Sequence, residues 1–137
     1  MRYACLGVLI AVSLLVPHAR VAAAEPRDVT GEYVMSGKGA GEGDRPYTGT
    51  CTLKIVGTIY DVSCFNADTR HTYSGKGVLL GDHFSTVIGD VLQGDHSAVY
   101  AGEYLVVYRL SPDNSMKGRW VHASSGAHGE ETLTLKK

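Results

Sequence analysis

Two cysteines bracket the segment Cys51-Thr-Leu-Lys-Ile-Val-Gly-Thr-Ile-Tyr-Asp-Val-Ser-Cys64. With Gly57 and Thr58 as the central residues of a two-residue turn, the flanks pair as a β-hairpin, because a type II′ turn needs positive φ at its first central position and glycine adopts it freely. That register places Cys51 directly opposite Cys64. We therefore predict a hairpin that is closed by a Cys51–Cys64 disulfide.

The side chains of this hairpin alternate as the same register requires. One face carries the cysteines and apolar residues, and the other carries polar residues with one opposite-charge pair. Counted outward from the turn, the cysteines occupy a non-hydrogen-bonded pair, where the two backbones lie closest and a disulfide fits. A reactive dithiol is the alternative, but no cation is placed to lower a thiol pKa. The cross-strand pairs are Leu53 with Val62, Ile55 with Tyr60, Thr52 with Ser63 and Lys54 with Asp61.

The N-terminus is typical of a secretory signal peptide. Arg2 gives a positive start, the run Leu6–Val16 is apolar, and the small residues Val21–Ala24 form a cleavage site. The apolar run is shorter than the roughly 20 residues that a transmembrane helix needs. We therefore expect residues 1–24 to be removed, with an uncleaved anchor as the alternative.

The mature chain is then expected to be residues 25–137, forming one domain that is exported to a periplasm or secreted. Its net charge is −3, from 11 Lys and Arg against 14 Asp and Glu. It has no basic stripe for nucleic acid and no second hydrophobic segment for insertion into a membrane. Cys5 leaves with the signal peptide, so the two remaining cysteines are expected to form a disulfide in an oxidising compartment.

The rest of the chain repeats short β-rich runs that are separated by Gly, Pro, Asn and Asp. No helical periodicity follows the signal peptide. Sequential antiparallel strands leave two sheet edges to protect, and closure into a barrel removes both. We predict an eight-stranded antiparallel up-and-down β-barrel, with a β-sandwich as the alternative. The strands are expected near residues 30–37, 47–56, 59–66, 70–80, 83–89, 98–110, 115–123 and 129–136.

Two further turns support a meander of neighbouring strands. Gly81-Asp82 is expected to join one pair of strands, and Ser111-Pro-Asp-Asn114 another. The second turn fixes which residues share a face across its two strands. It places Val106, Tyr108 and Leu110 beside Trp120, Gly118 and Met116.

The histidines do not form a metal motif. Five follow the predicted cleavage site, and none lies two or four residues from another. A zinc site would therefore have to be assembled through space, so we predict no metal. The nearest grouping is His83 with Asp82, Asp95 and His96.

Catalytic patterns are also missing from the sequence. Glu130 and Glu131 are adjacent, and neighbouring strand residues point to opposite faces, so they cannot share one substrate. The glycine-rich run Ser36–Gly43 has no helix after it to grip phosphate, and we interpret it as a loop between the first two strands. No Gly-x-Ser-x-Gly elbow is present. The sequence predicts a protein without enzymatic activity or cofactor.

Aromatic residues are the remaining candidates for function. The chain has eight Tyr and one Trp against two Phe. Rings that carry a polar group suit a barrel mouth or a recognition surface, although they also fill small cores. The candidate ligand contacts are Tyr33, Tyr60, Tyr104, Tyr108 and Trp120.

Short motifs across the mature chain carry a family resemblance. They include Gly31-Glu-Tyr33, Tyr73-Ser-Gly-Lys-Gly77, Lys117-Gly-Arg-Trp120 and Gly129-Glu-Glu-Thr-Leu133. In these the chain resembles a family of small secreted bacterial proteins of poorly defined role, some labelled fibronectin-binding, and more distantly the avidin and lipocalin barrels. The resemblance implies that Gly31-Glu-Tyr33 opens the first strand and that Arg119-Trp120 packs across the barrel floor. No set of biotin-contacting residues is matched.

Together these features predict an exported binding protein. Its partner is expected to be a small apolar ligand or an extracellular or envelope protein. The alternative is an enzyme inhibitor that acts through a protruding loop, either Gly39–Arg45 or Gly94–Ser97.

Overall fold

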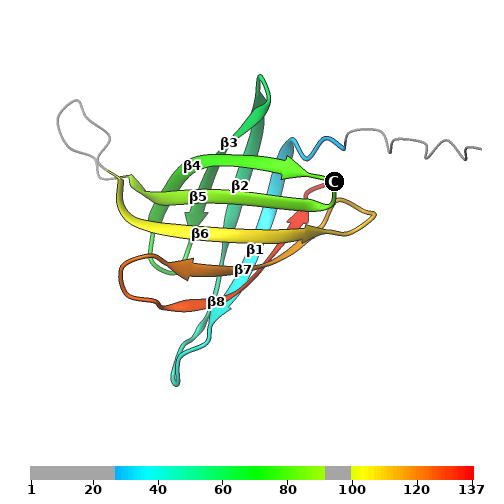
Figure 1. The fold of residues 1–137 in the computed structure, drawn as a ribbon. Coiled ribbons are helices and arrows are strands. Elements are labelled where there is room, and N and C mark those ends of the chain that lie inside the picture. Colours follow the sequence, from blue (N-terminus) through cyan, green and yellow to red (C-terminus); the bar gives the residue numbers. More distant parts are fainter. Residues whose placement is uncertain (1–26, 92–99) are drawn as a thin grey trace, which may run out of the picture.

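A computed structural model describes residues 27–91 and 100–137, and it shows eight antiparallel strands that close into a barrel in chain order (Figure 1). The predicted up-and-down barrel is confirmed, and the sandwich alternative is wrong because β1 pairs with β8. The described residues contain no helix, and thus none that could cross a membrane. The predicted signal peptide lies outside them. The strands are β1 Gly31–Gly39, β2 Pro46–Val56, β3 Ile59–Asn66, β4 His71–Leu80, β5 His83–Val91, β6 Tyr100–Leu110, β7 Met116–His122 and β8 His128–Leu135.

The predicted hairpin register is confirmed for every pair. Cys51 lies opposite Cys64, and the two form a disulfide with their Cα atoms 4.0 Å apart. That separation is closer to the roughly 4.5 Å of a non-hydrogen-bonded pair than to the roughly 5.5 Å of a hydrogen-bonded one. Gly57 has a φ of 65°, as the first position of a II′ turn requires. Both cysteines are buried, so the disulfide lies inside the barrel.

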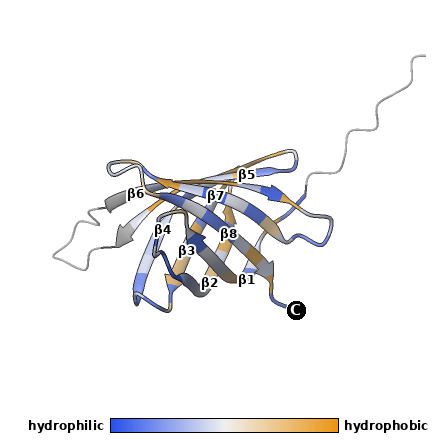
Figure 2. Ribbon diagram, turned by 90° about the horizontal axis from the view of Figure 1, so that it is seen from below, coloured by the Kyte–Doolittle hydropathy of each residue, from blue (hydrophilic) through white to orange (hydrophobic). Residues whose placement is uncertain are grey.

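The two ends of the barrel differ in what they carry. The turn end has the tight turns at 57–58, 81–82 and 111–115 together with both ends of the described chain. The loop end has the β1–β2, β3–β4 and β7–β8 connections at 40–45, 67–70 and 123–127. Hydrophobic and hydrophilic residues alternate along the strands between these ends (Figure 2), because successive residues face the interior and the outside in turn.

The turn-end half of the interior is filled by large side chains. Tyr33, Leu53, Phe84 and Met116 are all fully buried there. Val29 plugs this end, and its carbonyl oxygen accepts a 2.7 Å hydrogen bond from the Tyr33 hydroxyl. Burial raises the pKa of Tyr33 to about 12. The turn end is therefore a packed core.

Glycines on the inner face make room for rings on the neighbouring strand. Gly118 lies opposite Tyr108, and Gly129 lies opposite Trp120. A Cβ at Gly118 would lie 2.5 Å from a Tyr108 ring atom, and one at Gly129 would lie 2.6 Å from a Trp120 ring atom. These glycines thus allow the two rings to lie against the barrel wall.

The expectation that Ser36–Gly43 forms a loop is wrong for its first half. Ser36 to Lys38 belong to β1 and pair with both β2 and β8, and Gly39 ends the strand and pairs with β8 alone. Gly37 lies opposite Tyr47, whose ring occupies the space that a side chain at position 37 would need. The glycines here serve strand packing, and the loop is only 40–45.

Candidate ligand-binding site

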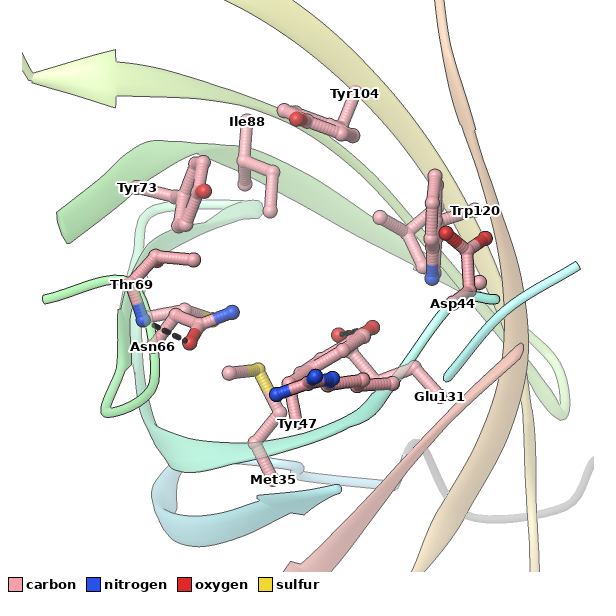
Figure 3. Close-up of a pocket in the computed structure, with 14 residues that line it drawn as sticks. Met35, Asp44, Tyr47, Asn66, Thr69, Tyr73, Ile88, Tyr104, Trp120 and Glu131 are labelled. Carbon is pink, nitrogen blue, oxygen red and sulfur yellow. Dashed lines mark hydrogen bonds between the residues drawn. The ribbon is translucent and has the colours of Figure 1, made fainter. Parts of the chain in front are cut away.

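The loop-end half of the barrel encloses a cavity of about 260 Å³ (Figure 3). Every strand from β1 to β8 contributes at least one residue to its lining. Its volume lies near the lower limit of ligand pockets, which span roughly 300–1,000 Å³. The lining residues are Met35, Gly39, Asp44, Arg45, Tyr47, Cys64, Asn66, Thr69, Tyr73, Ile88, Tyr104, Val106, Trp120 and Glu131.

Aromatic rings from three strands form one continuous wall of the cavity. Tyr73 on β4 meets Tyr104 on β6 edge to face, with ring centroids 5.5 Å apart. Tyr104 meets Trp120 on β7 in the same way at 5.8 Å. Tyr47 on β2 faces the cavity from another side, beside Glu131 (Figure 3). The rings hold one another in place, so the wall is preorganised.

A buried glutamate lies against this wall. Glu131 on β8 is 9% exposed. Its Oε2 accepts a 2.9 Å hydrogen bond from the Tyr47 hydroxyl, and its Oε1 accepts one from the Tyr108 hydroxyl. Burial raises the pKa of Glu131, while the two hydrogen bonds act to lower it. Two phenol donors thus hold one carboxyl group inside the barrel.

Both phenols are held in the protonated form. Burial raises the pKa of Tyr108 and of Tyr47, and the nearby charge of Glu131 raises each further. A protonated phenol donates its one hydrogen to a carboxylate oxygen. The arrangement therefore favours an ionised Glu131 as the acceptor of both bonds.

Two donors in the cavity are left for another molecule. The Trp120 Nε1 is buried and has no hydrogen-bond partner within the described residues. It lies near the Tyr47 hydroxyl and lowers the pKa of that phenol slightly against the larger effect of burial. Asn66 uses its Oδ1 to accept bonds of 2.9 and 3.1 Å from the backbone of Asp68 and Thr69. Its amide nitrogen then points into the cavity (Figure 3). Unpaired donors of this kind suit a ligand that carries an acceptor.

The loop at 40–45 borders the cavity with two opposite charges. Asp44 and Arg45 are both exposed and both line the cavity. The Asp44 Oδ2 accepts a 2.7 Å bond from the backbone N–H of Gly41, which fixes the loop. Two neighbouring exposed charges of opposite sign cancel over a short distance in water.

A second hollow lies over Gly118 between β6, β7 and β8, with a volume of about 460 Å³. It is lined mainly by outward charged side chains, among them Arg109, Lys117 and Glu130. Although larger, it has no aromatic wall that could desolvate a ligand. The cavity inside the barrel is therefore the better candidate site.

The predicted contact residues fall in two places. Tyr104 and Trp120 line the cavity. Tyr33 and Tyr60 are buried toward the turn end, and Tyr108 reaches the site only through Glu131.

Sequence reasoning missed four residues of the site, namely Tyr47, Asn66, Tyr73 and Glu131. One signal was available for Glu131. It lies two and four residues before Leu133 and Leu135 in β8, so it shares their inward face.

Two other expectations from the sequence, the packing of Arg119-Trp120 and the grouping around His83, are not confirmed. The Arg119-Trp120 pair does not pack across the barrel floor, because Arg119 is exposed and Trp120 lies in the loop-end half. His83 pairs with Asp82 at 2.7 Å at the turn end, while Asp95 and His96, like the loop Gly94–Ser97, lie outside the described residues. No group of three metal-binding side chains occurs in the part of the chain that the structure describes.

Comparison with known proteins supports the fold. The chain is similar to the solved structure of a de novo designed fluorescence-activating β-barrel, with a TM-score of 0.54 and 15% sequence identity over 78% of this chain and 93% of that one. No protein family and no curated protein matches the sequence. The similarity places the chain in the class of small closed β-barrels.

Proposed function

We propose that this protein is an exported, non-enzymatic binding protein that holds one small, largely apolar molecule in the loop-end half of its barrel. The observation that carries the proposal is the cavity wall of Tyr73, Tyr104 and Trp120 beside an unpaired indole N–H. Such a wall desolvates a flat ligand, and the N–H orients it. Ligand pockets commonly combine a mostly apolar lining with a few placed polar groups.

The size of the cavity restricts the ligand to a compact molecule. A volume of about 260 Å³ favours one or two rings rather than a long lipid chain. Met35 and Ile88 add apolar surface next to the aromatic wall. Eight-stranded barrels are wide enough to hold one small ligand when their side chains leave a gap, and the similar designed barrel is fluorescence-activating.

Export is part of the same proposal. It is supported by the predicted signal peptide and by the Cys51–Cys64 disulfide, since disulfides persist mainly in oxidising compartments. A role without catalysis is supported by the sequence, which lacks the catalytic patterns considered above.

The test is to fill the cavity and to make the matched change outside it. Ile88 lines the cavity and is 8% exposed, whereas its neighbour Val87 points outward and is 52% exposed. The exported protein is purified from its own host, and native mass spectrometry records any retained small molecule. We expect one in the wild type and in Val87→Phe and none in Ile88→Phe.

A second measurement uses Trp120, the one tryptophan in the chain, as a fluorescence reporter. One-ring and two-ring compounds should change its emission in the wild type and in Val87→Phe but not in Ile88→Phe. If no molecule is retained and no such compound changes the emission, the proposal is wrong.

A second candidate is the binding of an extracellular or envelope protein. A row of outward apolar residues favours it, because Val87, Leu105 and Val121 lie side by side across β5, β6 and β7 and are each more than a third exposed. Contiguous exposed apolar surface often marks a protein contact. Leu105→Lys should then abolish capture of the partner without changing the response of Trp120 to small molecules.

A further inference from the structure

The charges around the cavity do not cancel. Asp44 and Arg45 offset one another at its border, and Glu131 remains as a single negative charge inside. The ion pairs found in the described residues involve other groups, and no cationic side chain among those residues lies within 4.0 Å of Glu131. The barrel thus contains a buried carboxylate whose hydrogen-bond partners in the described chain are two neutral hydroxyls.

Hydroxyl donors do not remove the cost of such a group. A buried carboxylate loses its hydration, and neutral hydrogen bonds replace that loss only in part. The raised pKa of Glu131 has burial as its first cause and reflects this cost. Each carboxylate oxygen also keeps a free lone pair after it has accepted one bond. Glu131 can therefore accept further hydrogen bonds, and a positive charge would supply the largest gain.

The aromatic wall favours the same charge. The faces of Tyr and Trp rings carry negative potential and attract organic cations, more strongly where water is excluded. Tyr47 and Trp120 flank Glu131 in the cavity, and Tyr104 packs on Trp120 at 5.8 Å. A carboxylate next to several rings is the combination that recognises an ammonium group.

We propose that the ligand of this cavity is a small organic cation, an ammonium group attached to a flat ring. This inference rests on the proposed function and specifies the chemistry of its ligand. The ammonium group binds at Glu131 between Tyr47 and Trp120, and the ring packs on Tyr73 and Tyr104. An oxygen on the same molecule would satisfy the donor of Asn66 or Trp120.

The positive charge of Arg45 at the border of the cavity favours an anionic ligand as the alternative, but the exposure of this side chain argues against it. Arg45 is exposed and stands beside the exposed Asp44, so water and salt screen both charges. Glu131 is 9% exposed and is screened much less. The buried charge therefore decides the preference of the cavity.

The test compares three probes of nearly equal size that differ in the charge of the head group. Phenethylamine is a cation at pH 7, phenethyl alcohol is neutral and phenylacetate is an anion. Binding to the full mature protein is measured by isothermal titration calorimetry and by the emission of Trp120. We expect the cation to bind at least about tenfold more tightly than the neutral probe, since hydrogen bonds between charged groups are stronger than those between neutral ones, and the anion to bind least.

Glu131→Gln and Glu130→Gln form a matched pair of variants. Both remove one carboxyl group from β8, but Glu131 faces the cavity and Glu130 is exposed on the outer face. We expect Glu131→Gln to abolish the preference for phenethylamine and to retain binding of phenethyl alcohol. Glu130→Gln should keep the wild-type order of the three probes.

The outcomes separate this inference from the proposed function. If phenethyl alcohol or phenylacetate binds in the wild type as tightly as phenethylamine, the cation preference is wrong and the binding function stands. If none of the three binds but native mass spectrometry finds another retained small molecule, the cation preference is wrong and the binding function stands. If none of the three binds, no molecule is retained and no one-ring or two-ring compound changes the emission of Trp120, both proposals are wrong. The wild-type ranking decides the matter even if Glu131→Gln does not fold.

Discussion

Glu131 shows at the scale of one residue what the sequence could and could not predict. Alternation along a strand correctly placed Glu130 and Glu131 on opposite faces. It could not predict the partners of Glu131, because the two tyrosines that bind it are 84 and 23 residues away in the chain. Contacts of that kind depend on barrel closure, which no local pattern encodes.

The free energy of unfolding should report the cost of burying Glu131. Its ordinary pKa is 4.5, and burial raises the value in the folded protein, so the folded chain binds this proton more tightly than the unfolded chain. The contribution of this carboxyl group to the free energy of unfolding is therefore fully present below pH 4.5, where the group is protonated in both states. It is lost as the pH rises through the folded-state pKa, because the buried group then becomes charged. In Glu131→Gln this loss is absent. We expect the stability of the wild type relative to Glu131→Gln to fall as the pH rises from about 4 to 7.

Urea denaturation at several pH values measures this difference. Glu130→Gln is the control, because it removes an exposed carboxyl group from the same strand. A difference between the wild type and Glu131→Gln that stays constant with pH would contradict the prediction.

At the scale of one element, the β2–β3 hairpin was predictable in full. Its turn residues, its alternation and its cysteines all required one register, and the structure has that register from Val56–Ile59 at the turn to Gly49–Asn66. The glycine-rich run Ser36–Gly43 was harder, because glycine favours loops in general, whereas Gly37 pairs with β2 and β8 and leaves space for the ring of Tyr47. Local chemistry predicted the first case, and packing between strands decided the second.

The disulfide should stabilise the barrel without setting its register. The two cysteines are separated by 13 positions, and closing a loop of that size contributes on the order of 3 kcal/mol by restricting the unfolded chain. We expect the double variant Cys51→Ala, Cys64→Ala to lose about that much free energy of unfolding in urea. Its amide NMR spectrum should keep the cross-strand contacts of β2 and β3. Loss of those contacts would show that the disulfide also specifies the pairing.

Gly75 is the position on β4 where a side chain would disturb the sheet most. A Cβ there would overlap the backbone carbonyl oxygen of Val87 on β5, and a backbone atom cannot move aside as a flexible side chain can. We expect Gly75→Ala to destabilise the protein by about 1–3 kcal/mol through this overpacking. Thermal and urea unfolding measure the change.

Ser74→Ala at the preceding residue is the control for Gly75→Ala. Ser74 is the next residue on the same strand and faces the outside, so its truncation should change the stability by less than about 0.5 kcal/mol. Equal effects of the two substitutions would contradict the packing argument.

At the scale of the whole molecule, the closed barrel followed from the number and spacing of the strands. Eight short sequential strands with turn residues between them have few ways to protect both edges, and β1 indeed pairs with β8. The division of the interior into a filled half and a hollow half was not predictable. It depends on where the large rings lie, and that is fixed by glycines opposite them, such as Gly118 opposite Tyr108.

The predicted processing of the chain can be tested on the intact protein. Cleavage after Ala24 and closure of one disulfide give a mass equal to residues 25–137 less two hydrogen atoms. We expect this mass in the exported fraction of cells that produce the full-length chain. A mass that retains residues 1–24 in that fraction would contradict the signal-peptide assignment.

The positions of the two chain ends have a practical consequence. Lys136, the next-to-last residue, donates its backbone N–H to the Glu32 carbonyl oxygen at 2.8 Å, so both ends of the described chain lie together at the turn end (Figure 1). The cavity lies in the other half. Immobilising the protein on a sensor chip by a tag at its C-terminus would leave the loop end directed away from the surface. Fusion to a reporter protein at the same point would likewise leave the cavity accessible to analytes.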